Sequence, residues 1–414
     1  MRRCSERLCR AAFVWTLCAA ACAGCGDPTV EPVRTSFLIV VEHSLYEPLE
    51  PSLTRYIETM DAEGVDVHVE PWLPGTVDEL KGILFEYVDL DEIEGALLIG
   101  ELPAAWYEQV AFDSHESFPT DVYLQDRDAS WTDEDGNGVF DAHSNLDLEI
   151  YTSRLNGTVA QLQDYFARLE YYRRVGPLVD VSGFVFIDDD WAGVNTEGAF
   201  ELERLYRVVE VVKDKTESSI DTYLAKLTGE GAEFTYQWMH ATPHFVSIRH
   251  VNELNQATYG ILRNIDQYNF RGSFFNLYNC SAARFTEDTP SVAQEYVVGS
   301  DYGLAIIGST KTGAVKNAHV FHENLVLGAR WGEAYRAWFN DVGKRSDAWH
   351  LGIVLMGDPL LRLTGDLPPT PTEIPQMVPE AVMLDDEIMK NIAAGARLGT
   401  FDQYRSSHPE FFEE

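Results

Sequence analysis

A thiol, an imidazole and a group of carboxylates each follow directly on a predicted strand of this sequence. Cys280 follows SFFNLYN, His240 follows FTYQWM, and Asp188–Asp190 follow GFVFI. A cysteine thiolate is a nucleophile, and a nearby imidazole can lower its pKa and later protonate a leaving amine. A carboxylate can orient that imidazole. These residue types predict acyl transfer, provided that the fold brings them together.

Cysteine usage singles out Cys280. The protein has six cysteines, and the other five all lie within the first 25 residues: Cys4, Cys9, Cys18, Cys22 and Cys25. A single thiol in the body of the protein cannot form an internal disulfide. In an oxidising compartment, either burial or chemistry should account for such a thiol. On this count alone, an inert buried cysteine is the simpler interpretation.

The N-terminus has the features of an export signal. Several arginines precede an apolar stretch at 11–23, and Cys22-Ala23-Gly24-Cys25 resembles a bacterial lipobox with Cys22 where leucine is usual. We therefore expect residues 1–24 to be a lipoprotein signal peptide, with Cys25 lipidated and 25–35 forming a tether. An ordinary signal peptide is the alternative. The expected location is the outer membrane or cell surface of a bacterium, although these residues leave inner versus outer membrane open.

The composition limits the kinds of molecule that this protein is expected to bind. The chain has 414 residues, of which 45% are hydrophobic, so it can bury a substantial core. Its formal net charge is −36. So negative a charge argues against nucleic acid as a partner and suits cation binding. We expect membrane association only through the N-terminal lipid.

Strands alternate with helices along most of the chain, which predicts an α/β fold with mainly parallel sheets flanked by helices. We expect two adjoining α/β halves, 36–175 and 176–365, which could share one sheet. A Pro-rich linker and a C-terminal helix are expected over 366–414. The predicted strands are 36–42, 65–69, 94–100, 149–152, 183–187, 234–239, 273–278 and 303–308, and the predicted helices are 51–63, 76–87, 160–174, 197–213 and 251–268.

The predicted helix at 251–268 would supply the crossover that parallel strands require between His240 and Cys280. Both side chains would then lie at the carboxyl edge of the sheet, where open parallel sheets bind ligands. The backbone N–H of Cys280, with one after His240, could stabilise an oxyanion. His244, four residues further on, is an alternative base.

An acidic loop, Asp133–Asp141, has the spacing of a calcium-binding loop. Its twelfth position is Ser144 rather than glutamate, so other acidic residues would have to complete the shell, and the alternative is an exposed Asp/Gly-rich turn. We expect a structural calcium ion and no organic cofactor. The predicted ligands are Asp133, Asp135, Asn137, Val139 and Asp141, with Asp126, Asp128 or Glu149 as possible additions.

An ordered set of segments resembles the gingipain family of cysteine peptidases, which has a caspase-like fold. The two central segments are WMHAT, around His240, and LYNC, which ends at Cys280; Met239 and Ala241 stand where the family has glycines. The resemblance implies that Cys280 is the nucleophile and His240 the acid/base. It also implies an orienting acid at Asp190, with Asp188 and Asp189 beside it. The other segments, in the family's order, are ALLIGELP, IYTSRL, VAQEYV, GLAIIGSTKTG and MGDPLL.

The resemblance implies a cysteine endopeptidase that cleaves protein or peptide substrates through a Cys280 thioester, and the N-terminal signal adds the expectation that it is exported and lipid-anchored. Two alternatives remain open on the sequence. One is an inactive binding or scaffold lipoprotein with the same fold, in which Cys280 is buried and unreactive. The other is a transpeptidase, in which an amine resolves the thioester instead of water. Neither substrate preference nor oligomeric state can be derived from the sequence.

Overall fold

The computed structural model describes residues 34–192, 201–252, 254 and 256–368. The predicted signal peptide, Cys25, nearly all of the tether and most of the predicted C-terminal segment lie outside these described residues. So does the beginning of the predicted helix at 197–213.

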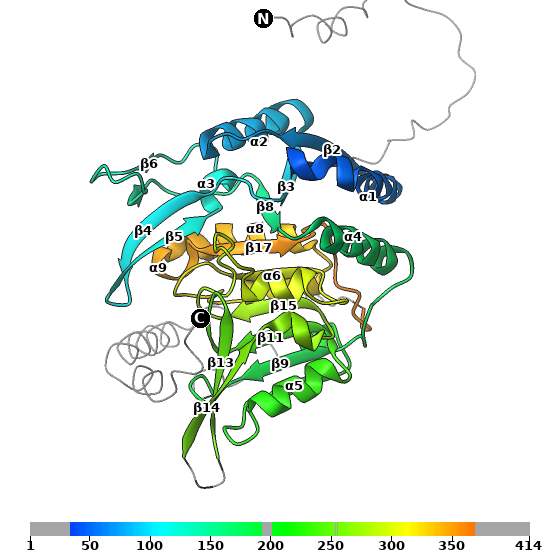
Figure 1. The fold of residues 1–414 in the computed structure, drawn as a ribbon, viewed down its shortest axis with the longest axis vertical. Coiled ribbons are helices and arrows are strands. Elements are labelled where there is room, and N and C mark those ends of the chain that lie inside the picture. The colour runs from blue at the N-terminus through cyan, green and yellow to red at the C-terminus, as the bar shows by residue number, and fades with distance from the viewer. Residues whose placement is uncertain (1–33, 193–200, 253, 255, 369–414) are drawn as a thin grey trace, which may run out of the picture. The chain divides into compact units, whose positions relative to one another are not determined.

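A sheet of ten strands runs through the described residues (Figure 1). All neighbouring strands in it are parallel except β16 and β17. The central strands are nearly continuous apolar runs because both faces of the sheet are covered. In their order across the sheet, the strands are β10 (Val209–Val212), β9 (Gly183–Ile187), β11 (Ala232–Trp238), β15 (Gly272–Tyr278), β16 (Ala305–Ser309), β17 (Ile353–Gly357), β8 (Tyr151–Leu155), β3 (Ile93–Ile99), β1 (Thr35–Glu42) and β2 (Val65–Trp72).

The two predicted halves contribute to this single sheet. Strands β8, β3, β1 and β2 come from the first half and occupy one end, and the strands of the second half occupy the other. The halves meet where β17 pairs with β8. The caspase-like α/β class expected from the sequence is therefore confirmed, and the three candidate catalytic residues all lie in the second half.

Helices cover both faces of the sheet. In β1, Leu38 and Val40 pack in one core with residues of α2, whereas Phe37 and Ile39 belong to the larger core on the other face. This alternation follows from the two-residue period of a strand. The longer helices are α1 (His43–Ala62), α2 (Val77–Asp91), α4 (Val159–Arg174), α5 (Ile220–Thr228), α6 (Val292–Val298), α7 (His319–Val326) and α8 (Trp331–Asp341). None of the helices within the described ranges is long and apolar enough to cross a bilayer.

The connection from β11 to β15 corrects one expectation. Instead of a helix at 251–268, it forms an antiparallel sheet of β12 (His240–Thr242), β13 (Phe245–Val251) and β14 (Ala257–Arg263), followed by a short 3-10 turn, Ile265–Tyr268. The β13–β14 hairpin projects beyond the edge of the large sheet (Figure 1). The segment is rich in β-branched and aromatic residues, which favour strands.

The helix expected at 197–213 is also wrong over its described part. Leu202–Arg204 forms a single 3-10 turn, and Val209–Val212 is the edge strand β10. Three of the four residues in the VEVV sequence of β10 are valines, which favour a strand because they are β-branched.

Two smaller hairpins lie outside the large sheet. One is formed by β4 (Ala105–Ala111) and β5 (Ser114–Thr120), and the other by β6 (Trp131–Thr132) and β7 (Ala142–His143), which enclose the acidic loop. Two short helices, α3 (Val122–Gln125) and α9 (Asp347–His350), and a 3-10 turn at Gly343–Arg345 complete the described elements.

Candidate functional site

Three adjacent strands end together at one edge of the large sheet. The register aligns Ile187 of β9 with Trp238 of β11, and Trp238 with Tyr278 of β15. His240 and Cys280 are therefore each two residues beyond paired strand ends. The three parallel strands thus direct the acid, the imidazole and the thiol to the same edge of the sheet.

The segments that lead to His240 and Cys280 are joined by a buried side chain. Asn279 donates from Nδ2 to the carbonyl oxygen of Met239 over 2.8 Å. Its Oδ1 accepts a hydrogen bond from Gln237 over 3.0 Å. Because Asn279 and Met239 immediately precede the two reactive side chains, these bonds fix the backbone of one relative to the other.

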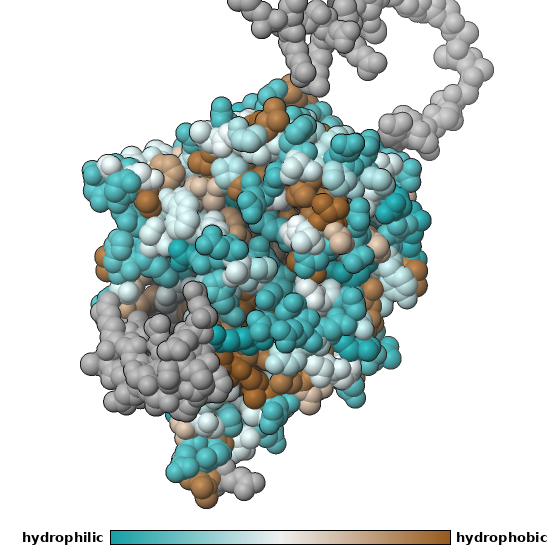
Figure 2. Space-filling model, in the orientation of Figure 1, coloured by the Kyte–Doolittle hydropathy of each residue, from teal (hydrophilic) through white to brown (hydrophobic). Residues whose placement is uncertain are grey.

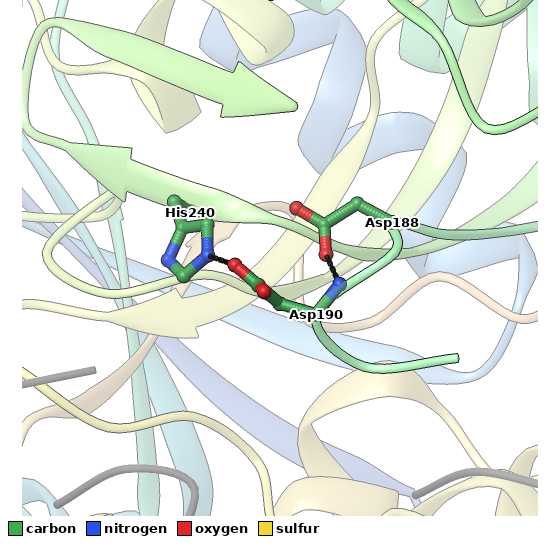
Figure 3. A group of neighbouring side chains, drawn as sticks. All are labelled: Asp188, Asp190 and His240. Carbon is green, nitrogen blue, oxygen red and sulfur yellow. Dashed lines mark hydrogen bonds and ion pairs between the residues drawn. The ribbon is translucent and has the colours of Figure 1, made fainter. Parts of the chain in front are cut away.

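The His240 imidazole is bound by a carboxylate. Its Nε2 lies 2.8 Å from Oδ2 of Asp190 (Figure 3). The side chain of His240 is 21% exposed and that of Asp190 is 28% exposed. Asp188 is fully buried beside this pair, with its Oδ1 accepting the backbone N–H of Asp190 over 3.0 Å, and it forms no hydrogen bond to the imidazole among the contacts of the described residues. Of the three neighbouring aspartates, Asp190 is the one that contacts the imidazole.

The electrostatics of this group stabilise the charged form of the imidazole. Burial acts to lower the pKa of His240, but the hydrogen bond that its Nε2 donates to Asp190 and the charge of Asp188 outweigh it, so the pKa is raised. Burial acts to raise the pKa of Asp190, but the bond to His240 and the charge of Arg249 hold it below its usual range. The pKa of Asp188 rises to about 7, mainly because burial penalises its charged form.

Cys280 is partly buried beside a tight loop. The backbone N–H of Gly313 donates to its sulfur, and the next residue, Ser281, has a left-handed φ of 56° and donates its N–H to the Lys311 carbonyl over 2.8 Å. Burial raises the pKa of the thiol to about 11; Glu116 acts to raise it further, and Lys311 acts to lower it. The thiol is therefore protonated near neutral pH in this state of the site.

Lys311 is itself buried, and burial lowers its pKa to about 8. Its Nζ donates to the carbonyl of Thr312 over 2.5 Å and to that of Ala348. The carboxylate of Glu116 accepts the backbone N–H of Thr312 over 2.9 Å. A buried cation and a carboxylate are thus both held near the thiol.

No hydrogen bond joins the Cys280 thiol to the His240 imidazole among the residues that the structure describes. Because Nε2 is bound to Asp190, Nδ1 is the imidazole nitrogen that remains for proton exchange. The alternative base, His244, is 44% exposed and lies 3.6 Å from Glu287. His244 therefore belongs to a separate, exposed pair.

Sequence reasoning missed the residues that support the site. Asn279 was open to prediction, because a polar residue directly precedes the cysteine at the end of a predicted strand. Arg249, Glu116 and Lys311 gave no such signal, since Arg249 lay between a predicted strand and a predicted helix and Glu116 lies far from Cys280 along the chain.

The acidic loop brings together a different set of carboxylates from the one expected. Oxygens of Asp135 and Asp141 lie close to one of Glu108, which comes from β4, and all are within 4.8 Å of one another. Carboxylates grouped in this way suit calcium. Asp133 instead accepts the backbone N–H groups of Gly136, Asn137 and Gly138.

The other predicted members of the calcium shell have separate partners. Asn137 donates to Glu108 over 2.6 Å and accepts the N–H of Val139. Asp126 accepts the N–H groups of Asp128 and Asp147, and Glu149 accepts that of Arg127. Glu108 was not predictable from the loop, because it is placed there by backbone pairing between Phe140 and β4.

Comparison with known proteins identifies the family. The family model described as peptidase family C25 matches residues 86–364, which is most of the chain and includes Asp190, His240 and Cys280. A search of curated proteins finds no match. The resemblance found in the sequence is therefore confirmed. A peptidase of this family acts on proteins or peptides. The chain belongs to peptidase family C25, the gingipain family of cysteine peptidases.

Proposed function

We propose that this protein is an active endopeptidase in which Cys280 is the nucleophile, His240 the acid/base and Asp190 the residue that orients the imidazole. The observation that carries this proposal is the meeting of β9, β11 and β15 at one edge, where Asp190 binds His240 and Asn279 ties the histidine segment to the cysteine segment. Family membership supports the same assignment.

The chemistry begins with the neutral form of His240, in which Nε2 carries the proton and donates to Asp190 and Nδ1 is unprotonated. Nδ1 accepts the thiol proton as sulfur attacks the carbonyl carbon of the scissile bond, and Asp190 stabilises the imidazolium that forms. The backbone N–H groups of Cys280 and Ala241 are the proposed donors to the oxyanion. When the C–N bond breaks, the imidazolium returns its proton to the leaving amine. Water, deprotonated by His240, then hydrolyses the thioester and releases the free thiol and the acid.

We further propose that the protein is exported, lipidated at Cys25 and anchored to the outer membrane or cell surface. The lipobox-like CAGC segment supports this. A structural calcium ion is proposed at the loop, held by Glu108, Asp135 and Asp141, whose clustered carboxylates fit it. Calcium would neutralise these carboxylates and take no part in the acyl transfer.

Labelling of Cys280 with a peptidyl acyloxymethyl ketone tests the proposal, because this electrophile reacts with activated thiolates. We expect one label per protein, which is lost in Cys280→Ala and slowed at least about a hundredfold in His240→Ala, in line with the usual contribution of a general base. His244→Ala is the matched control and should label at the wild-type rate. Cleavage of a mixed peptide library is then measured with the same variants.

One observation favours a second function, that of an inactive scaffold. The thiol has a raised pKa and makes no hydrogen bond to His240 among the described residues. If only the unfolded protein were labelled, and no peptide were cleaved by the folded protein, the endopeptidase proposal would be withdrawn in favour of the scaffold.

A further inference from the structure

Arg249 lies on the same hairpin as His240. Strand β12 pairs with β13 so that His240 is opposite Ser247, and Arg249 is two residues beyond Ser247 on β13. Side chains two residues apart in a strand, and directly opposite residues of an antiparallel pair, point to the same face. The hairpin therefore presents His240 and Arg249 on one face, toward the loop that follows β9.

The backbone of Arg249 is bonded to that loop. Its N–H donates to Oδ2 of Asp188 over 3.3 Å, and its carbonyl accepts the N–H of Asp189 over 3.1 Å. Asp188 in turn accepts the N–H of Asp190 at its other oxygen. These bonds hold the three aspartates in register with the hairpin.

The guanidinium of Arg249 binds two of the carboxylates. Its NH1 contacts Oδ2 of Asp189 and lies 3.3 Å from Oδ1 of Asp190. The other oxygen of Asp190, Oδ2, is the one that binds His240. The Asp190 carboxylate is thus held at one oxygen by a cation and offers the other to the imidazole, and Asp189 holds the cation from its far side.

We propose that Arg249 is a positioning residue of the peptidase: by holding Oδ1 of Asp190, it keeps Oδ2 on the His240 imidazole. The inference rests on the function proposed above for His240 and Asp190, and it adds a residue that touches neither the thiol nor the scissile bond. A rigid ion pair suits this task, because a planar guanidinium restricts the orientation of a carboxylate more than a lysine ammonium does.

If Arg249 acted on His240 only through its charge, removing it would change the pKa of His240 in the direction opposite to that expected from a positioning role. The charged and titratable groups around this pair are Asp188, Asp189 and Asp190 from the loop after β9, Arg249 from β13 and the Tyr259 phenol from β14. As a cation near His240, Arg249 acts to lower the histidine pKa, whereas the hydrogen bond that His240 donates to Asp190 acts to raise it and is the stronger of the two effects. Loss of charge alone would raise the pKa of His240, and loss of the Asp190 contact would lower it.

The test is an NMR titration of the histidine ring nitrogens in the purified protein, with the His240 signal assigned from its absence in His240→Gln. We expect Arg249→Met to shift the His240 midpoint to lower pH and to lower kcat/KM by about tenfold to a hundredfold, as displaced catalytic groups do. Arg249→Lys should restore part of both. Arg263→Met is the matched control, since Arg263 is on the same small sheet and packs on Phe245, at 5.1 Å from the ring centroid.

The outcomes separate this inference from the proposed function. A midpoint in Arg249→Met that rises, or stays at the wild-type value, overturns the positioning role even if the enzyme is active. A fall in the midpoint supports it even if no peptide is cleaved, because the titration reports the contact between Asp190 and His240 directly. An equal fall in Arg263→Met would show a general loosening of the hairpin and would also overturn the inference.

Discussion

The reactivity of Cys280 depends on two opposing charges near its sulfur. Lys311 acts to lower the pKa of the thiol, and Glu116 acts to raise it. Both are fixed by the Thr310–Gly313 loop: Lys311 donates to the Thr312 carbonyl, and Glu116 accepts the Thr312 N–H. The pKa of the thiol is therefore subject to two charges of opposite effect. Removing Lys311 should raise this pKa, and removing Glu116 should lower it.

Paired substitutions test this balance. We expect Lys311→Met to slow alkylation of Cys280 by iodoacetamide several-fold at pH 7 and to shift the pH–rate profile to higher pH, because the thiolate loses a cation. Glu116→Gln should shift the profile to lower pH, since the amide oxygen can still accept the Thr312 N–H while the negative charge is lost. Lys344→Met, which removes an ammonium paired with Asp147, is the control. Shifts of the same sign in both variants would contradict this account.

Some of these residues could be predicted from the sequence and others could not. The difference lies in whether a strand of the large sheet or a hairpin packed against it places the residue. Cys280, His240 and the aspartates each follow a predicted strand, so the topology of a parallel sheet was enough to place them at one edge. Glu116 and Arg249 reach the site only through hairpins that fold back onto it from elsewhere in the chain. Such contacts depend on tertiary packing and leave no periodic signal in the sequence.

At the level of elements, α6 holds both ends of the small sheet that bears His240. The N–H of Val292, its first residue, donates to the carbonyl of Pro243 in the β12–β13 turn over 2.7 Å. Glu295 accepts the N–H of Ile265, just after β14, over 2.7 Å. A helix was expected between His240 and Cys280 because a parallel crossover usually contains one. Here the hairpin makes the crossover, and α6 follows the cysteine instead.

The contact through Glu295 gives a stability prediction with a definite sign. Burial raises the pKa of Glu295 to about 7, above its ordinary value of 4.5. The folded state thus binds this proton more tightly than the unfolded state, so the wild type loses stability as the pH rises from about 4.5 through about 7. Glu295→Gln can still accept the Ile265 N–H and avoids this loss.

We therefore expect Glu295→Gln to have a higher Tm than the wild type at pH 8, and the gap to shrink toward zero at pH 4.5. Thermal unfolding followed by circular dichroism at both pH values measures it. Glu217→Gln, at an exposed position before α5, should show no such pH-dependent gap. A gap that grows on acidification would mean that the carboxylate is stabilised by ionisation in the folded state.

At the level of the whole molecule, eight of the ten strands of the large sheet were predicted, mostly because buried parallel strands are short apolar runs, whereas β10 and β17 were not. The pairing of β17 with β8, which unites the two halves, could not be derived, since no local pattern encodes which strands become neighbours.

The excess of acidic residues was also visible in advance. It corresponds to a surface on which hydrophilic residues predominate and hydrophobic ones are interspersed in the view of Figure 2.

The acidic loop is connected to the site through the β4–β5 hairpin. Phe140, at the end of the loop, exchanges backbone hydrogen bonds with Trp106 and Glu108 of β4. Strand β5 carries Glu116 and also accepts a hydrogen bond from Arg284, just beyond the cysteine, at the carbonyl of Ser117 over 3.1 Å. Calcium bound by Glu108, Asp135 and Asp141 would therefore brace the hairpin that holds Glu116 near the thiol.

Calcium should accordingly stabilise the protein. A ligand that binds only the folded state at about 100 times its Kd adds about 2.7 kcal/mol. We expect Tm to rise on adding calcium at constant ionic strength and to fall with a chelator. The gain should be lost in Asp135→Asn and Glu108→Gln but kept in Asp164→Asn, which changes an exposed carboxylate on α4. Asp133→Asn should lower Tm even without calcium, because its carboxylate accepts three backbone N–H groups of the loop. An equal gain in all variants would instead reflect general screening of the negative charge.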